Sequence, residues 1–135
     1  MFQTTFALKT NDKIEVIDIT KKIEEIVRKS KIEDGCCHIF LPHATAGIIL
    51  NENEKGLMED YVKWLKEFFP KKEWKHNLID NNAEAHLMSA FIGQSILIPI
   101  KKNKLVRGTW QDILFIEFDG PRSTRKVFVQ IHAII

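Results

Sequence analysis

Two short apolar runs on either side of a polar bend constrain the fold more than any other feature of this sequence. Residues 39–41 lead into Pro42 and His43, and residues 48–50 leave the bend. This pattern predicts two β-strands that meet at a tight corner with a polar tip. A corner of this kind places a histidine and a hydroxyl group at the rim of a sheet, where side chains can reach a ligand.

Three segments are expected to be helical. Apolar residues recur at helical spacing in residues 19–30 and 54–69, which predicts two amphipathic helices, the second ending at Pro70. Asn82 before residues 83–92 and Gly93 after them are typical of the two ends of a third helix. Residues 71–80 have no periodicity and are expected to form a loop.

The remaining segments have the length and the apolar pattern of strands. We predict strands at residues 2–10, 13–17, 36–41, 94–100, 105–106, 111–118 and 125–134, with the first two forming a hairpin and 36–41 in the centre of a sheet. Because strands do not alternate strictly with helices, the expected class is α+β. We predict a single domain over residues 1–135, with a mixed, largely antiparallel β-sheet or sandwich and about three helices.

Composition and motifs exclude several classes of protein. The net charge is +2 and basic residues form only short pairs, so nothing in the sequence argues for nucleic acid as a partner. No apolar stretch approaches the ~20 residues of a membrane span, and the N-terminus lacks the features of a secretory signal. We therefore expect a cytoplasmic protein with no membrane partner. Sequence signatures of P-loop, dinucleotide-binding and serine-hydrolase sites are absent.

Three histidines are the first candidates for chemistry. His43 lies at the corner, His76 in the loop at residues 71–80, and His86 near the start of the third helix. Three neutral imidazoles can hold zinc and leave one coordination position open. Their spacing does not match a known metal motif, however, so isolated surface or capping roles remain an alternative.

Charged residues near the last two strands form a second candidate group. Glu117 and Asp119 are two residues apart on one strand and share a face, and Arg122 and Arg125 follow them. One interpretation is a local ion network that closes the turn at residues 120–121. The other is an arginine clamp for phosphate or carboxylate, beside a pair of carboxylates that acts as acid and base or holds a metal.

The segment Gly108-Thr109-Trp110-Gln111 is a third candidate. A glycine at a strand entrance lets the backbone approach a partner closely. Trp110 offers a flat face to a heterocycle, and Gln111 offers a hydrogen-bond donor and an acceptor. Packing in the core is the alternative role for Trp110.

The order of these motifs resembles the YjbQ family across about residues 41–129. The resemblance rests on Pro42, His43, Thr45, Gly47, Asn51, Glu52, Asn53, Asp60, Pro70, His76, Ala85, His86, Gly93, Ser95, Ile98, Pro99, Gly108, Thr109, Trp110, Gln111, Glu117, Gly120 and Arg125. It implies a small α+β domain that assembles as a homotrimer. It also implies a weak thiamine-phosphate synthase activity on phosphorylated small molecules.

On this resemblance we assign a histidine-centred site for a metal or an anion. His43, His76 and His86 are the expected ligands of a divalent metal, which is zinc, or magnesium if pyrophosphate is handled. The expected catalytic residues are Glu52, Gln111 and Glu117, and the expected substrate-binding residues are Thr45, Trp110, Asp119, Arg122 and Arg125.

Two other functions stay open at this stage. Three histidines on zinc would also support a metal-dependent hydrolase, and a non-catalytic trimer that binds an anionic ligand would need the same pocket.

The chain also departs from the family twice. Ala44-Thr45 stands where Thr-Ser is common, and residues 78–82 replace an acidic loop that contains glycine. Both departures touch the expected site.

Overall fold

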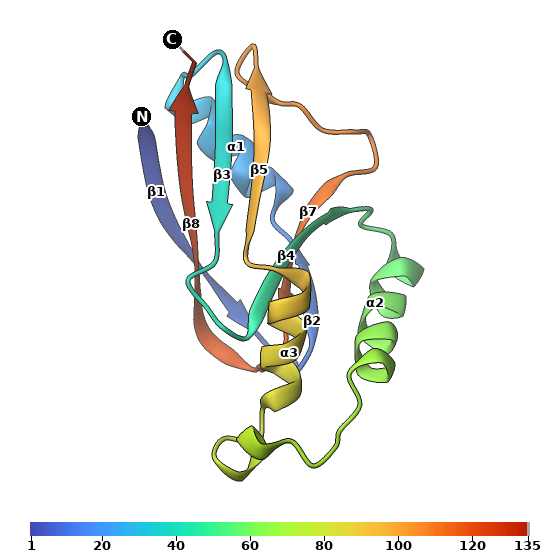
Figure 1. Ribbon diagram of the computed structural model, residues 1–135. Coiled ribbons are helices and arrows are strands. Elements are labelled where there is room, and N and C mark those ends of the chain that lie inside the picture. Colours follow the sequence, from blue (N-terminus) through green and yellow to red (C-terminus); the bar gives the residue numbers. More distant parts are fainter. Residues whose placement is uncertain (135) are drawn as a thin grey trace.

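The computed structural model of the chain describes residues 1–134, which form an α+β domain as predicted (Figure 1). Its strands are β1 (Phe2–Thr10), β2 (Glu15–Asp18), β3 (Gly35–Phe40), β4 (Ala46–Asn51), β5 (Ser95–Lys101), β6 (Lys104–Leu105), β7 (Asp112–Glu117) and β8 (Arg122–Ala133). Its helices are α1 (Thr20–Ser30), α2 (Lys55–Phe68), α3 (Ala83–Ile92) and a short 3-10 helix, η1 (Lys75–Leu78).

The strands form two sheets in which every described pairing is antiparallel. The larger sheet has the order β1-β8-β3-β5-β6, and the smaller one has the order β2-β7-β4. The prediction that the strand at residues 36–41 is central is confirmed, since β3 lies between β8 and β5.

The predicted opening hairpin is wrong. β1 pairs with β8, and β2 pairs with β7 in the other sheet. The Glu15 carboxylate accepts the backbone amides of Asn11 and Asp12 at 2.7 and 3.2 Å. These bonds hold the segment between the strands as an open bend, not as the two-residue turn that a hairpin needs.

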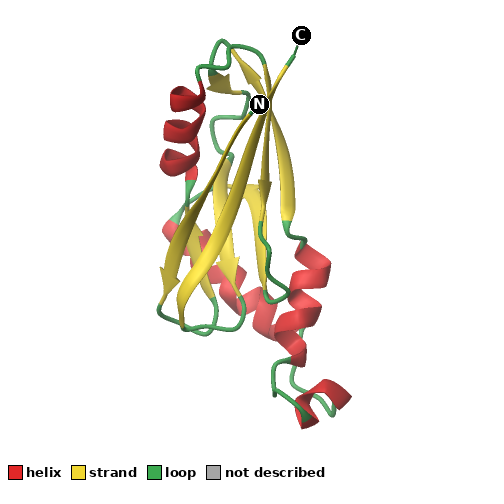
Figure 2. Ribbon diagram, turned by 90° about the vertical axis from the view of Figure 1, so that its left-hand side faces the viewer, coloured by secondary structure: helices red, strands yellow, loops and turns green. Residues whose placement is uncertain are grey.

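The main hydrophobic core lies between the two sheets. Ile23 and Ile26 of α1 pack there against side chains of both sheets, including Ile39 of β3, Phe115 of β7 and Val129 of β8. Helix α1 runs behind the larger sheet in Figure 1. In Figure 2 it is the helix at the upper left, beside the strands. The two sheets and α1 therefore enclose one core, which uses the apolar alternation of each strand.

A second, smaller core covers the other face of the three-stranded sheet. Leu65 of α2 and Met88 of α3 pack there against Ile116 and Phe118. Helices α2 and α3 thus form an outer layer next to the small sheet. Within the described residues, 1–134, no helix covers the outer face of the large sheet, which faces the viewer in Figure 1.

Apolar side chains remain exposed on both outer faces. Leu97 on the open face of the large sheet is 63% exposed, and Phe40 on β3 lies on the same face opposite Phe128 of β8. Phe68 of α2 and Phe91 of α3 are also exposed and stack against each other with ring centroids 5.4 Å apart. Patches of this kind commonly mark interfaces.

One asparagine joins the β5–β6 turn to the end of α1. Asn103 has a φ of 60°, and its side-chain amide donates to the carbonyls of Val27 and Ile32 at 2.9 and 2.8 Å. Asn103→Ala should lower the free energy of unfolding by about 2–3 kcal/mol, because it removes both bonds and strains a left-handed backbone. Asn103→Gly should lose less, because glycine tolerates this φ. Urea denaturation measures both losses, and wild-type stability of the glycine variant would contradict a role for the two bonds.

Candidate functional site

His43 lies at the corner between β3 and β4, beside the first half of β8. Its Nε2 accepts the backbone amide of Lys126 at 2.8 Å. Partial burial and the nearby Arg125 guanidinium lower the pKa of His43. The ring is therefore neutral at neutral pH, which is the form that binds metals.

A buried ion pair links this corner to β7 and β8. Arg125 is 3% exposed and Glu117 is fully buried. Arg125 Nε donates to Glu117 Oε1 at 2.8 Å, and its Nη2 donates to Glu117 Oε2 and, at 2.8 Å, to Thr45 Oγ1. Thr10 Oγ1 donates to Glu117 Oε1 at 2.8 Å. The arginine and the carboxylate satisfy each other, so in this chain they position the corner that carries His43.

The protonation of Glu117 follows from the same contacts. Burial acts to raise the pKa of its carboxyl group. Hydrogen bonds from Arg125, from the Asp119 amide and from Thr10 outweigh that effect, so the pKa of Glu117 lies below its usual value. The pair is therefore charged on both sides at neutral pH.

Asp119 and Arg122 close the turn between β7 and β8. Arg122 Nε donates to the Asp119 carbonyl and its Nη2 donates to Asp119 Oδ2, both at 2.9 Å. Lys13 pairs with the same carboxylate, and the Asn82 side chain donates to it at 2.9 Å. This geometry matches the ion-network interpretation of the two residues.

His76 and His86 form a contact pair at the junction of η1 and α3. Their ring centroids are 4.8 Å apart and the ring planes are nearly perpendicular, at 86°. The Nε2 atom of His76 is buried and has no hydrogen-bond partner. The nearest carboxylate oxygen recorded for this atom, Asp80 Oδ2, lies 3.8 Å away, beyond hydrogen-bond distance. The pair therefore presents an imidazole nitrogen for which the described residues provide no partner.

Glu52, Trp110 and Gln111 lie at the opposite end of the small sheet from Glu117. The β4–β7 register places Ala46 opposite Glu117 and Asn51 opposite Asp112. Five residues of strand separate these two ends by about 17 Å. The Gln111 side chain accepts the Gly108 amide at 2.7 Å, and Trp110 is 69% exposed. The interpretation of Trp110 as a core residue is therefore wrong for the single chain.

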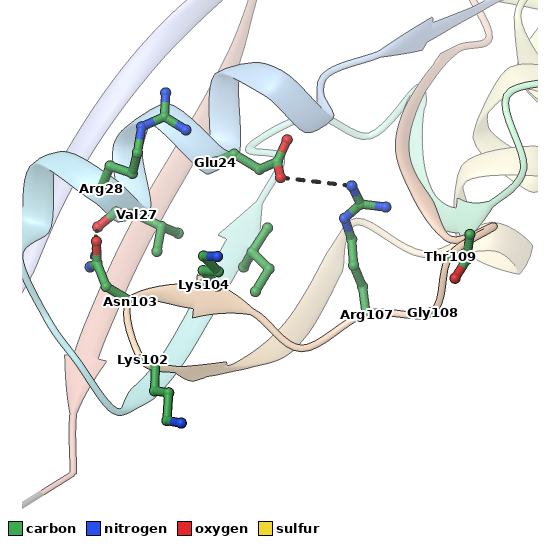
Figure 3. Close-up of a pocket in the computed structure, with 10 residues that line it drawn as sticks. Glu24, Val27, Arg28, Lys102, Asn103, Lys104, Arg107, Gly108 and Thr109 are labelled. Carbon is green, nitrogen blue, oxygen red and sulfur yellow. Dashed lines mark hydrogen bonds and ion pairs between the residues drawn. The ribbon is translucent and has the colours of Figure 1, made fainter.

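A cavity of about 620 Å³, shown in Figure 3, is lined by none of the three histidines. It opens between α1 and the segment from β6 to Thr109, and Arg28 and Lys104 are among its basic residues. Arg107 lies against Glu24 at 3.7 Å and donates to the Gln111 carbonyl at 2.9 Å. This cavity thus borders the Gly108-Thr109-Trp110-Gln111 segment.

A single chain does not bring the three histidines together. Among residues 1–134, no group of three or more His, Cys, Asp and Glu side chains is placed to hold a metal ion. The physical reason is the layering of the fold. His43 is bound by β8 of the large sheet, whereas His86 lies on α3, which packs on the far face of the small sheet through Ala85 and Met88.

Glu84 lies two positions before His86, but the sequence offered no reason to assign it a role in a site. This residue is 9% exposed, and its Oε1 atom is buried without a hydrogen-bond partner. The signal that could have found it is its position four residues before Met88, which places both side chains on the buried stripe of α3. A carboxylate on such a stripe is uncommon unless it is paired.

Comparisons with known proteins agree over nearly the whole chain. A family model described as YjbQ-like UPF0047 protein matches residues 4–133. A UPF0047 protein of Archaeoglobus fulgidus is 44% identical over 91% of this chain and 95% of its own length. The YugU protein of Bacillus subtilis, also named UPF0047, is 37% identical over 94% of this chain and 96% of its own length.

Solved structures give the same result. The crystal structure of a YbjQ-like protein of unknown function from Sulfolobus solfataricus superposes with a TM-score of 0.96. It is 48% identical and the match covers 98% of this chain and 97% of that one. Within residues 1–134, helices long and apolar enough to cross a membrane are absent.

Proposed function

Because the chain belongs to the YjbQ-like UPF0047 family, we propose that it functions as a homotrimer with a divalent metal site centred on His76 and His86. The supporting observation is the buried Nε2 of His76, which has no hydrogen-bond partner. Leaving such an atom unsatisfied costs about 1–3 kcal/mol. Neutral imidazoles are favoured ligands of zinc, so the donor type fits this metal.

The third ligand in this proposal is His43 of a second copy of the chain. His43 is neutral and lies at an outer corner, but the layers of one subunit keep it apart from the pair on η1 and α3. Binding a metal would exchange its bond to the Lys126 amide, worth about 1 kcal/mol, for a metal bond. Structural zinc in zinc-finger peptides binds with about 10–16 kcal/mol, which is far more than the hydrogen bond that is lost.

Exposed apolar side chains support association between copies. Phe40 and Leu97 lie on the open sheet face, and Phe68 and Phe91 lie on the helical layer. A cyclic trimer would also let Glu52, Trp110 and Gln111 of one subunit approach the corner of another, although they lie far from it within one chain. The proposal thus explains why residues that belong together by motif are separated in the monomer.

The proposed reaction is a transfer on a phosphorylated small molecule, similar to thiamine-phosphate synthase chemistry. The bound metal would supply Lewis acidity toward the phosphate oxygens, with magnesium in place of zinc if pyrophosphate leaves. Trp110 would stack on a heterocycle, and Glu52, Gln111 and Thr45 would orient the substrate or move protons. Arg125 and Glu117 would hold the corner, and Arg122, whose side chain is 44% exposed, would attract the phosphate.

A metal-dependent hydrolase is the second candidate. The observation that favours it is the donor set itself, since three imidazoles and an open position are typical of zinc sites that hydrolyse their substrates. A trimer that binds an anionic ligand without turnover would use the same residues. The three candidates use the same site and differ in what happens to the bound molecule.

Loss of metal tests the proposal. His76→Ala and His86→Ala should each weaken zinc binding at least ~10-fold, because each removes a direct ligand. His132→Ala is the matched control, since His132 is exposed on β8. Elemental analysis measures metal per chain, and two assays measure joining of a pyrimidine diphosphate to a thiazole phosphate and hydrolysis of phosphate esters.

Each outcome separates the candidates. If the variants lose both the metal and the joining reaction, the result supports the transferase. If they lose both the metal and the hydrolysis of phosphate esters, it supports the hydrolase. Metal loss that changes neither reaction removes the support for an enzyme and leaves the ligand-binding trimer. Undiminished zinc in both variants overturns the metal site.

A further inference from the structure

A second cavity, of about 310 Å³, lies between α2, α3 and the segment before β2. Phe69, Met88 and Phe118 provide its apolar wall, and it has room for about ten water molecules. We propose that this cavity binds a small molecule with an ammonium group at one end, an apolar body, and a phosphate or carboxylate group at the other end. This site is separate from the histidine site.

Two unpaired acceptors support the ammonium end. Glu84 and Asn82 both line the cavity, and Glu84 Oε1 and Asn82 Oδ1 are buried without hydrogen-bond partners. The other oxygen of Glu84 receives only a long bond of 3.3 Å from Asn77. An ammonium group has three donors and a positive charge, so it satisfies both acceptors and neutralises the carboxylate.

Three lysines support the anionic end. Lys13, Lys66 and Lys71 line the cavity and all three are exposed residues. Lys13 pairs with Asp119. No salt bridge is recorded for Lys66 or Lys71 among the described residues, so their charges are available at the mouth. An anion held there is attracted by several like charges at once.

The polarity of the cavity sets the order of the ligand groups. The acceptors are buried and the cations are exposed, so the ammonium group enters first and the anion stays near solvent. Glu84 and His86 are two residues apart on α3, which places their side chains about 200° apart around the helix. Neither His76 nor His86 lines this cavity. Binding here can therefore be measured independently of the metal.

Calorimetry with two probes tests the inference. The probes are para-aminomethylbenzoate and para-aminomethylphenyl phosphate, which carry the two kinds of anion on the same amine and ring. At least one should bind wild type, and Glu84→Gln should weaken binding ~10-fold or more by removing the charge opposite the ammonium. Lys66→Ala and Lys71→Ala should weaken it ~2- to 10-fold, with a smaller salt dependence than wild type.

The controls isolate this cavity from the rest of the molecule. Glu73→Gln removes an exposed charge outside the lining, so it should bind the probes as wild type does. The two lysine variants change exposed residues and keep the test valid if Glu84→Gln fails to fold. Failure of both probes to bind wild type, or equal binding by all the cavity variants, overturns the inference. A result of either kind leaves the metal proposal unaffected.

Discussion

Arg125→Met should lower the free energy of unfolding by about 3–5 kcal/mol, because it leaves the Glu117 carboxylate charged and buried without its partner. Glu117 is fully buried, and Arg125 provides two of its hydrogen bonds. Methionine keeps most of the volume of the side chain, so the loss reports the missing charge and not a cavity. A loss of this size is a large share of the 5–15 kcal/mol typical of a whole domain.

Two further variants show whether the loss comes from the ion pair. Adding Glu117→Gln to Arg125→Met removes the unpaired charge and should restore at least half of the lost stability. Arg122→Met breaks an ion pair whose arginine is 44% exposed and whose carboxylate keeps Lys13 as a partner, and should change stability by about 0–1 kcal/mol. Urea denaturation measures all three. Equal losses for Arg122→Met and Arg125→Met would contradict a structural role for the buried pair.

Local pattern located the elements of the fold but not all of their partners. The strand predicted at residues 2–10 and the helix predicted at 83–92 have the observed bounds, because alternation and capping are local properties. The partner of β1 is β8, more than a hundred residues away, and no local pattern indicates that pairing. The hairpin was wrong for this reason.

The candidate site shows the same limit. Sequence identified Glu117 and Arg125 but could not show that both side chains are buried and bound to each other. It identified His43 but not its hydrogen bond to Lys126, which spans 83 positions. The burial of Glu84 could not be predicted, because a buried carboxylate runs against the usual preference of its residue type.

Two variants that each fail to bind zinc should together restore metal binding if the site is shared between subunits. His43→Ala and His76→Ala should each lose tight zinc binding when expressed alone, because each removes one of the proposed ligands. In mixed trimers, a site is intact where His43 of one subunit meets His76 and His86 of a neighbour from the other variant. Random assembly at equal amounts places intact partners together at about one quarter of the sites.

The most direct measurement is therefore zinc per chain in trimers assembled from these two variants together. The account predicts recovery of about one quarter of the wild-type zinc after joint assembly, and none when the two purified trimers are mixed without exchange of subunits. The same fraction should return in whichever reaction the wild type performs. Full zinc in His43→Ala alone, or no recovery in mixed trimers that form normally, would contradict a site completed by His43 of a second copy.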